Sequence, residues 1–207
     1  MLNPWEEISL SDYEKHMSLD SVLQLQTMNK MMKRQFEIYP ATTAMIFGIA
    51  GGNGLEHVRK EKYYKVFAVD INAEYLKTVQ KRYSELNGIL ECIHMDLIED
   101  SEKLPQAELV IANLLIEYIG YEAFQKSVIQ VNPKYVSCII QINTDEETWV
   151  SDSPYLHAFD GLDAVHHQME EKYLSEAMEK IGYEQINLLE CPLSNGKKLV
   201  QLDFEKM

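Results

Sequence analysis

The chain alternates between two hydrophobic periodicities. Short, continuous apolar runs are typical of buried strands, and they occupy residues 44–49, 66–70, 89–94, 108–112 and 135–142. Between them, apolar residues return every three or four positions, as on one face of a helix, and we expect helices at 18–37, 55–62, 73–86 and 121–130. Strand and helix alternate five times, which predicts an α/β fold whose parallel sheet is covered on both faces.

The pattern changes after the fifth strand. Residues 143–162 form an irregular polar stretch, and a connection of that length inside a compact domain is usually functional or mobile. A helix is expected over 165–181. Two β-like runs, 183–190 and 199–204, then flank Asn195-Gly196, a strong hairpin signal. The C-terminal end therefore predicts an antiparallel pair.

Composition and charge exclude several classes of protein. With 207 residues, 46% hydrophobic and 25% charged, the chain suits one ordinary globular domain. The net charge of −14 makes a nucleic-acid partner unlikely and disfavours an anionic membrane surface, because both require basic residues. The three scattered cysteines form no disulfide or zinc pattern, and no signal segment or membrane span is evident, so we expect a cytoplasmic protein. Whether it is a monomer or a homodimer stays open.

The sharpest local feature is a glycine cluster, Ala50-Gly51-Gly52-Asn53-Gly54, directly after the first strand. Glycines let a ligand approach the main chain, and the carboxyl end of this strand is where open α/β sheets bind ligands. Asp70 ends the second strand, where it can accept hydrogen bonds from a ribose diol. The alternative is that the glycines only form a tight turn and Asp70 caps the next helix. The dinucleotide fingerprint fits poorly, since it needs glycine where Leu55 stands.

The glycine spacing resembles motif I of the class I S-adenosylmethionine-dependent methyltransferases. The likeness continues along the chain: 46–54 resembles the first strand and glycine loop, 66–70 resembles motif II, 92–97 resembles motif III and 109–119 resembles motif IV. No single motif is specific, but four in order are. The resemblance covers residues 44–204.

The resemblance implies a doubly wound, mostly parallel seven-stranded sheet that ends in a C-terminal antiparallel hairpin. It also implies a single domain over 1–207 with three parts. These are an N-terminal helical extension or lid at 1–40, a cofactor-binding Rossmann-like half at 41–142, and a substrate-side insertion, helix and closing hairpin at 143–207. The implied cofactor is S-adenosyl-L-methionine, with S-adenosyl-L-homocysteine as the product.

The resemblance assigns the cofactor to nine positions: Gly48, Ala50, Gly51, Gly52, Asp70, Ile71, Asp96, Leu97 and Asn113. The loop backbone would line the methionyl part, Asp70 would bind the ribose, and Asp96 would face the adenine amine. Ile71 and Leu97 would lie against the adenine, and Asn113 would offer its backbone carbonyl to the cofactor's amino group. For Asp96 and Asn113 the alternatives are a solvated loop carboxylate and a turn residue at a strand end.

Two positions depart from the family's pattern. The family usually has Asp or Glu where this chain has Gly48, and Gly where it has Ala50. Alanine is small enough to preserve the turn. The missing carboxylate removes one contact near the methionyl end of the cofactor.

Candidates for catalysis are harder to identify, because methyl transfer chiefly needs positioning and the exclusion of water, and a base only for some acceptors. Glu117 and Tyr118 follow the fourth strand, and Tyr13 and His16 lie in a leading segment that could fold over the cofactor. Each is equally a candidate for a structural or surface residue. Motif IV lacks the Asn-Pro-Pro-aromatic run of nucleobase methyltransferases, which favours a small-molecule or protein acceptor.

Acidic residues concentrate in one segment. Residues 143–180 carry ten acidic and two basic residues, a local charge of 2 − 10, or −8. Either this is a solvated surface, or it is a mouth that favours neutral or cationic acceptors. His166 and Glu170, one helical turn apart, are more typical of a wet surface than of a metal site, so no metal is expected. Two other functions stay open: a nicotinamide-dependent oxidoreductase and a non-catalytic nucleoside-binding protein.

Overall fold

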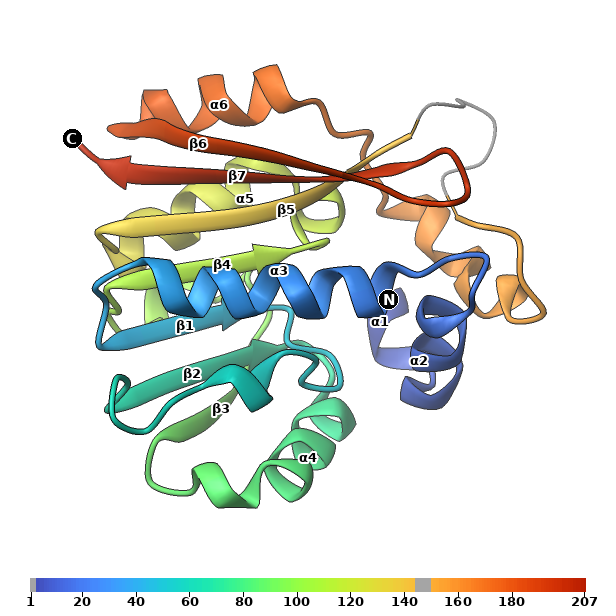
Figure 1. Ribbon diagram of the computed structural model, residues 1–207, viewed down its shortest axis with the longest axis horizontal. Coiled ribbons are helices and arrows are strands. Elements are labelled where there is room, and N and C mark those ends of the chain that lie inside the picture. The colour runs from blue at the N-terminus through green and yellow to red at the C-terminus, as the bar shows by residue number, and fades with distance from the viewer. Residues whose placement is uncertain (1–2, 144–149) are drawn as a thin grey trace.

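The computed structural model describes residues 3–143 and 150–207, and it contains one seven-stranded sheet in the order β3-β2-β1-β4-β5-β7-β6 (Figure 1). Strands β1 to β5 are parallel, and β7 runs antiparallel to both neighbours. The strands are β1 Thr43–Phe47, β2 Lys65–Asp70, β3 Leu90–His94, β4 Leu109–Asn113, β5 Tyr135–Ile142, β6 Tyr183–Pro192 and β7 Lys198–Lys206. The predicted seven-stranded, mostly parallel sheet with its closing hairpin is confirmed.

Six α-helices lie among the described residues: α1 Pro4–Glu7, α2 Leu10–Ser18, α3 Gln24–Ile38, α4 Ala73–Arg82, α5 Ile116–Val131 and α6 Glu171–Lys180. Four 3-10 helices accompany them: η1 Leu55–His57, η2 Ser84–Leu86, η3 Ser101–Lys103 and η4 Leu156–Ala164. Within this part of the chain, no helix combines the length and the apolar character needed to cross a membrane.

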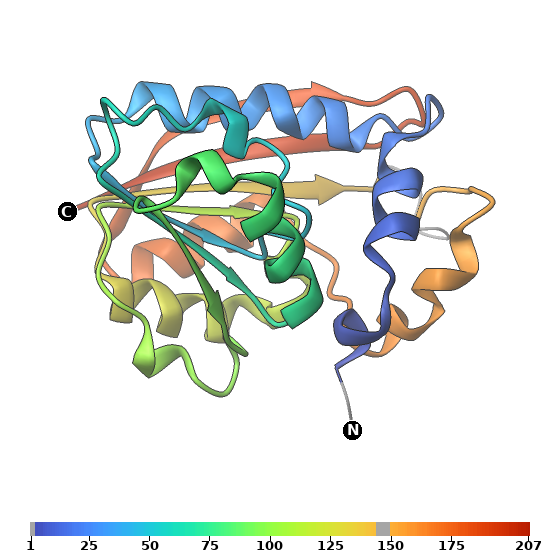
Figure 2. The same cartoon turned by 90° about the horizontal axis from the view of Figure 1, so that it is seen from below.

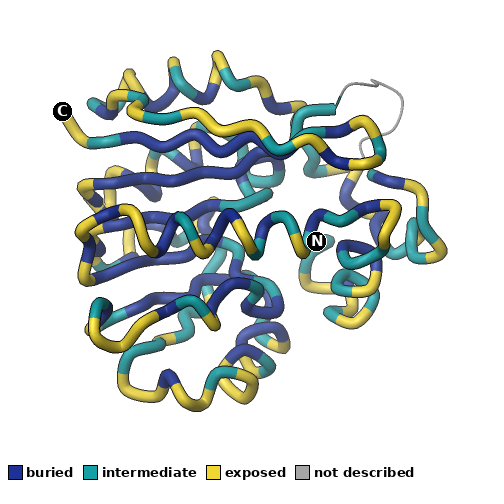
Figure 3. The backbone as a smooth tube through the Cα atoms, viewed as in Figure 1, coloured by how far each residue is buried: buried dark blue, intermediate teal, exposed yellow. Residues whose placement is uncertain are grey.

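The central strands are buried on both faces, as their continuous apolar runs predict (Figure 3). In β1, Ala44 and Ile46 face one side of the sheet, where they pack with residues of α3 and α4. Met45 and Phe47 alternate with them and pack with residues of α5 and α6 on the other side. The sheet therefore lies between two helical layers, each with its own core.

The strand order places a topological switch at β1. From β1 the chain moves outward to β2 and β3, then crosses to β4 on the other side of β1. Ligands of open α/β sheets bind at the carboxyl ends of the strands beside such a switch. Helices α1 and α2 and the 3-10 helix η4 lie beyond those ends (Figures 1 and 2).

The helix boundaries correct several sequence predictions. The helix expected at 18–37 begins only at Gln24, because residues 19–23 are non-helical and Leu23 adopts a left-handed conformation (φ 53°) just before α3. The expected helix at 55–62 is only the turn η1, since the backbone becomes extended at Val58. The helix expected over 165–181 begins at Glu171. By contrast, α5 starts earlier than expected and bends at Gly120, whose φ is 74°.

Candidate functional site

The glycine loop follows β1, and its backbone is hydrogen-bonded to the end of the neighbouring strand β2. The backbone N–H of Gly48 donates to the carbonyl of Val69 at 2.9 Å, and the N–H of Ala50 donates to Oδ2 of Asp70 at 2.8 Å. Gly48 (φ 68°) and Ala50 (φ 47°) both adopt left-handed backbone. Glycine adopts such conformations without strain, whereas other residues do so at a cost in energy. This is the physical reason to expect a glycine at the position that Ala50 occupies.

Close packing explains the next two glycines. A Cβ on Gly52, whose φ is 87°, would lie 2.5 Å from Cε2 of Tyr83. A Cβ on Gly51 would lie 2.8 Å from Nη1 of Arg82, which donates to the Gly51 carbonyl at 3.1 Å. Arg82 also pairs with Glu14 of α2. These glycines therefore let α4 and α2 approach the loop.

Asp70 is the main organiser of this edge of the sheet. It is 8% exposed, and its Oδ1 accepts the N–H of Asn72 at 2.8 Å. Burial raises the pKa of Asp70, while the N–H groups of Asn72 and Ala50 oppose the rise. A carboxylate has about four acceptor positions, so these two bonds leave capacity for a ligand. The cap of α4 is Asn72, whose Oδ1 accepts the N–H groups of Glu74 and Tyr75.

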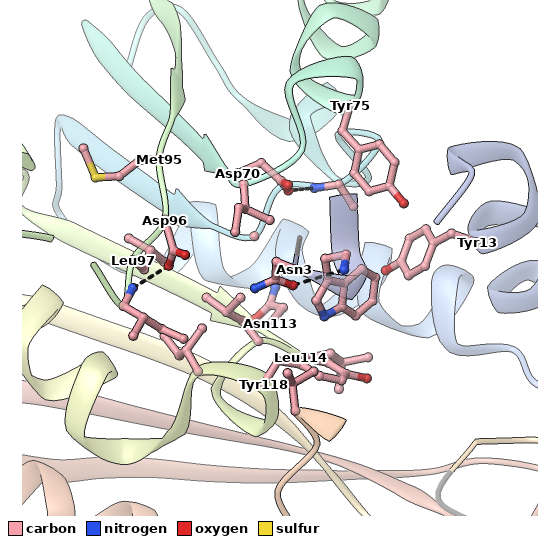
Figure 4. A pocket seen from close by; sticks show the side chains of 18 residues that line it. Asn3, Tyr13, Asp70, Tyr75, Met95, Asp96, Leu97, Asn113, Leu114 and Tyr118 are labelled. Atoms are coloured by element: carbon pink, nitrogen blue, oxygen red, sulfur yellow. Dashed lines mark hydrogen bonds between the residues drawn. The ribbon is translucent and has the colours of Figure 1, made fainter. Parts of the chain in front are cut away.

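A cavity, here called the strand-end cavity, opens at the carboxyl ends of β1, β2 and β4 and after β3 (Figure 4). Seven of the nine expected cofactor residues line it: Gly48, Ala50, Asp70, Ile71, Asp96, Leu97 and Asn113. Gly51 lines a neighbouring cavity behind the loop, and Gly52 lines neither. Oδ1 of Asp96 accepts the N–H of Ile98 at 2.8 Å, which fixes its carboxylate at the rim.

The Asn113 side chain is fully engaged away from the strand-end cavity. Its amide nitrogen donates to Oε1 of Gln35 at 2.9 Å, and its Oδ1 accepts from Nε2 of Gln35 at 3.0 Å. Gln35 also contacts Ser137 of β5, at 2.9 Å from its hydroxyl. This reciprocal amide pair ties α3 to β4 and leaves the Asn113 main chain as what this residue can present to a ligand.

The leading segment closes over the strand ends. The Trp5 carbonyl accepts from Nδ2 of Asn72 at 3.0 Å, and the Ile8 carbonyl accepts from the Tyr75 hydroxyl at 2.8 Å. Sequence reasoning missed Trp5 and Tyr75 as site residues, yet both line the strand-end cavity. A signal was present: Asn3 and Glu6 form a capping box, which marks an ordered helix start.

A second cavity, here called the lid cavity, adjoins the first. The structure brings all four catalytic candidates to its wall: Tyr13, His16, Glu117 and Tyr118. Four residues line both cavities and therefore lie at the boundary between them: Trp5, Tyr13, Leu114 and Tyr118. Ser151, Phe159 and His166 close the far side of the lid cavity.

Glu117 dominates the electrostatics of the lid cavity. It is 4% exposed, and its Oε2 makes no hydrogen bond within the described residues. Burial raises the pKa of Glu117 to about 7, with backbone hydrogen bonds opposing the rise. Nδ1 of His16 lies 2.7 Å from the Ser153 hydroxyl, and burial lowers the pKa of His16. Burial, with the charges of Asp70, Glu14 and Glu117, raises the pKa of Tyr13.

The described acidic side chains of residues 143–180 do not line these cavities. Asp145, Glu146 and Glu147 lie outside the described residues. None of the other seven acidic residues of 143–180 is on the wall of the strand-end cavity or the lid cavity, and six of them are exposed. Nor do His, Cys, Asp and Glu gather in any group of three that could hold a metal ion, within residues 3–143 and 150–207.

Comparison with known proteins gives structural relatives only. No protein-family model and no curated protein matches the sequence. Among solved structures, the N-methyltransferase NodS of Bradyrhizobium japonicum WM9, in complex with S-adenosylhomocysteine, aligns at 10% identity and a TM-score of 0.67, covering 95% of this chain and 97% of that chain.

Two further structures align over similar lengths. Magnesium protoporphyrin IX methyltransferase of Synechocystis PCC 6803, with bound SAM, gives 9% identity and a TM-score of 0.61 over 93% of this chain and 83% of that one. The cyclopropane synthase MmaA2 of Mycobacterium tuberculosis aligns at 10% identity and a TM-score of 0.65, covering 92% of this chain and 88% of that one. The chain therefore has the class I Rossmann-like fold of S-adenosylmethionine-dependent methyltransferases.

Proposed function

We propose that this protein is an S-adenosylmethionine-dependent methyltransferase that acts on a small-molecule acceptor. One observation carries the proposal: the loop residues Gly48 and Ala50 meet Asp70 and Asp96 in one cavity at the topological switch, and a second cavity adjoins it. Fold likeness alone would not establish an activity, because one fold serves many functions. The residues that line the two cavities provide the support that the fold alone does not.

The residues of the strand-end cavity fit an adenosyl cofactor. Asp70 keeps acceptor capacity for the ribose hydroxyls, and the second oxygen of Asp96 is left for the adenine amine. Ile71 and Leu97 provide apolar contact for the adenine ring. Asn113 would bind the amino group of the methionyl part through its main chain, since Gln35 holds its side chain.

The lid cavity fits the acceptor. The cofactor supplies a methyl group already activated on a sulfonium, so the protein mainly has to align the acceptor and exclude water. Tyr13 and Tyr118 line both cavities and are placed to hold acceptor and methyl group in line. Glu117 and His16 line only the lid cavity, where they would contact the acceptor and take a proton from it. We expect a neutral or cationic acceptor.

Isothermal titration calorimetry with S-adenosylmethionine, S-adenosylhomocysteine and NAD tests the cofactor. We expect both adenosyl-sulfur compounds to bind and NAD not to bind, because the glycine spacing departs from the dinucleotide fingerprint at Leu55. Binding of NAD alone would instead support an oxidoreductase. Binding of S-adenosylmethionine without transfer to any compound of a broad acceptor set would support a non-catalytic role.

A further inference from the structure

Two residues that line the lid cavity each have a buried polar atom without a hydrogen-bond partner among the described residues. Three buried side-chain atoms in the described part of the chain lack a hydrogen-bond partner, and two of them, Oε2 of Glu117 and Nε1 of Trp5, belong to residues lining this cavity. One is an acceptor and the other is a donor. Buried polar groups are nearly always paired in native proteins, so this pair indicates a ligand that donates to Glu117 and accepts from Trp5.

Aromatic rings line the same cavity as Glu117. Trp5 packs edge-on against Tyr118, with ring centroids 4.8 Å apart, and against Tyr13 at 5.9 Å. The rings of His16 and Phe159 lie 4.7 Å apart on the same wall. Ring faces attract cations through their quadrupole, and aromatic cages beside a carboxylate are how proteins recognise ammonium groups.

The charge balance of the lid cavity favours the same kind of ligand. The titratable groups around Glu117 are Tyr13, His16, Tyr118, Tyr121, Cys138 and His166. Burial raises the pKa of each tyrosine and of the cysteine, and it lowers the pKa of both histidines. Lys197 lies near enough to lower both histidine pKa values further. These pKa shifts favour the neutral forms of the tyrosines, the cysteine and the histidines at pH 7, so the charged groups in this region are Glu117, which lines the cavity, and the nearby Lys197.

We propose that the lid cavity binds a small amine as the methyl acceptor, with Glu117 receiving its ammonium group. The proposal rests on the methyltransferase function proposed above and names the acceptor class for it. The amine's carbon skeleton would lie among Trp5, Tyr118 and Phe159. Trp5 would donate to an oxygen or nitrogen elsewhere on the same compound.

The reaction balances with the groups present. The ammonium gives one proton to Oε2 of Glu117, which leaves a neutral amine and a neutral carboxylic acid. The amine lone pair then forms the N–CH3 bond while the S–CH3 bond breaks, and that electron pair stays on sulfur. One positive charge has moved from sulfur to the methylated nitrogen. Glu117 afterwards releases its proton to solvent.

Three probes with the same 2-phenylethyl group separate this proposal from its rivals: 2-phenylethylamine, 2-phenylethanol and 3-phenylpropanoate. They share a ring and a short chain and differ only in their ammonium, hydroxyl or carboxylate end. Their dissociation constants would be measured by NMR titration at pH 7.5, with and without saturating S-adenosylhomocysteine. We expect the amine to bind at least ten-fold more tightly than the alcohol, and the carboxylate more weakly still.

Glu117→Gln should abolish the preference for the amine while leaving the affinity for S-adenosylhomocysteine within two-fold. The matched control is Glu122→Gln, because Glu122 lies on the same helix with 85% of its side chain exposed, and it should keep the wild-type preference. Equal binding of the three probes to the wild type overturns the acceptor class, whether or not the variant folds. Failure of S-adenosylhomocysteine to bind overturns the proposed function instead. The probe titrations done in its absence would still show whether the lid cavity prefers the amine.

Discussion

The strand-end cavity and the lid cavity touch, yet they are built in opposite ways. Around the strand-end cavity, Asp70 and Asp96 each hold backbone N–H groups of the loops beside them. Around the lid cavity, Glu117 and Trp5 each leave a buried atom without a partner. Trp5 lines both cavities but Glu117 lines the lid cavity alone, so an unsatisfied carboxylate oxygen distinguishes the lid cavity from the strand-end cavity, whose two carboxylates both accept backbone hydrogen bonds. The backbone of the fold therefore holds the carboxylates of the strand-end cavity in place, whereas Glu117 of the lid cavity keeps an oxygen that a substrate can bind.

Replacing Asp70 attacks the first region and should give the largest effect. Asp70→Ala leaves the buried N–H groups of Ala50 and Asn72 without their acceptor, at about 1–3 kcal/mol for each donor. We expect unfolding in urea to show a loss of about 2–4 kcal/mol. Calorimetry should show S-adenosylmethionine binding weakened by about 1–3 kcal/mol, the usual range for a hydrogen bond to a charged group.

Asp96→Ala is the comparison for that variant. Asp96 holds a single N–H, that of Ile98, and is only half-buried, so its loss should cost less stability. Cofactor affinity that is unchanged in Asp70→Ala, in a protein that still folds, would contradict the placement of the ribose.

The second region should respond to pH instead. The pKa of Glu117 is about 7 in the folded protein against an ordinary 4.5, so the folded state holds its proton more tightly than the unfolded state does. The stability this gives is fully present below pH 4.5 and is lost as pH rises through 7. Glu117→Gln cannot titrate. It should therefore become more stable than the wild type across that window, by about 3 kcal/mol above pH 8.

Thermal unfolding of both proteins from pH 5 to pH 8.5 measures this effect. Glu122→Gln serves again as the control, since an exposed carboxylate on the same helix should leave the pH profile of the wild type unchanged. Parallel profiles for wild type and Glu117→Gln would show that the carboxylate is not a buried, strained group.

The sequence revealed the strand-end cavity because strand ends are positioned by the sheet itself. Ala50 lies in the loop after β1, and Asp70 and Asn113 end β2 and β4, so the predicted strands place all three at one edge of the sheet, while the family resemblance supplies the cofactor role of Asn113. Gly52 is the exception. Its lack of a side chain serves the contact with Tyr83, a reason that only the packing of α4 shows.

The lid cavity could be predicted only in part. Tyr13 and His16 lie in the leading segment that the sequence singles out, but the sequence does not show that this segment is a separate helix, α2, divided from α3 by residues 19–23. Trp5 and Phe159, which are far apart in the sequence, pack in one cluster there. A cavity wall of this kind depends on tertiary packing, which the hydrophobic periodicity of a single segment does not predict.

The glycine loop offers a smaller test of the first region. Gly48 has a φ of 68°, and a Cβ there would lie 3.0 Å from Cδ1 of Leu115. Restoring the family's acidic residue with Gly48→Asp should therefore cost about 1–2 kcal/mol through left-handed backbone strain, despite the added carboxylate. Urea unfolding and calorimetry on the same samples read both effects. A variant that gains cofactor affinity at no cost in stability would show that the loop is more adaptable than its contacts imply.

The smallest expected effect runs in the stabilising direction. Ala50 adopts a φ of 47°, and its N–H must hold this geometry to reach Asp70. Ala50→Gly relieves the left-handed strain, while glycine adds entropy to the unfolded chain, so the net gain should be about 1 kcal/mol or less. Differential scanning calorimetry should show a slightly higher Tm with unchanged affinity for S-adenosylhomocysteine. A lower Tm would mean that the hydrogen bond to Asp70 already compensates for the backbone strain at Ala50. The loop of the strand-end cavity would then be stabilised by its own contacts, unlike Glu117 in the lid cavity.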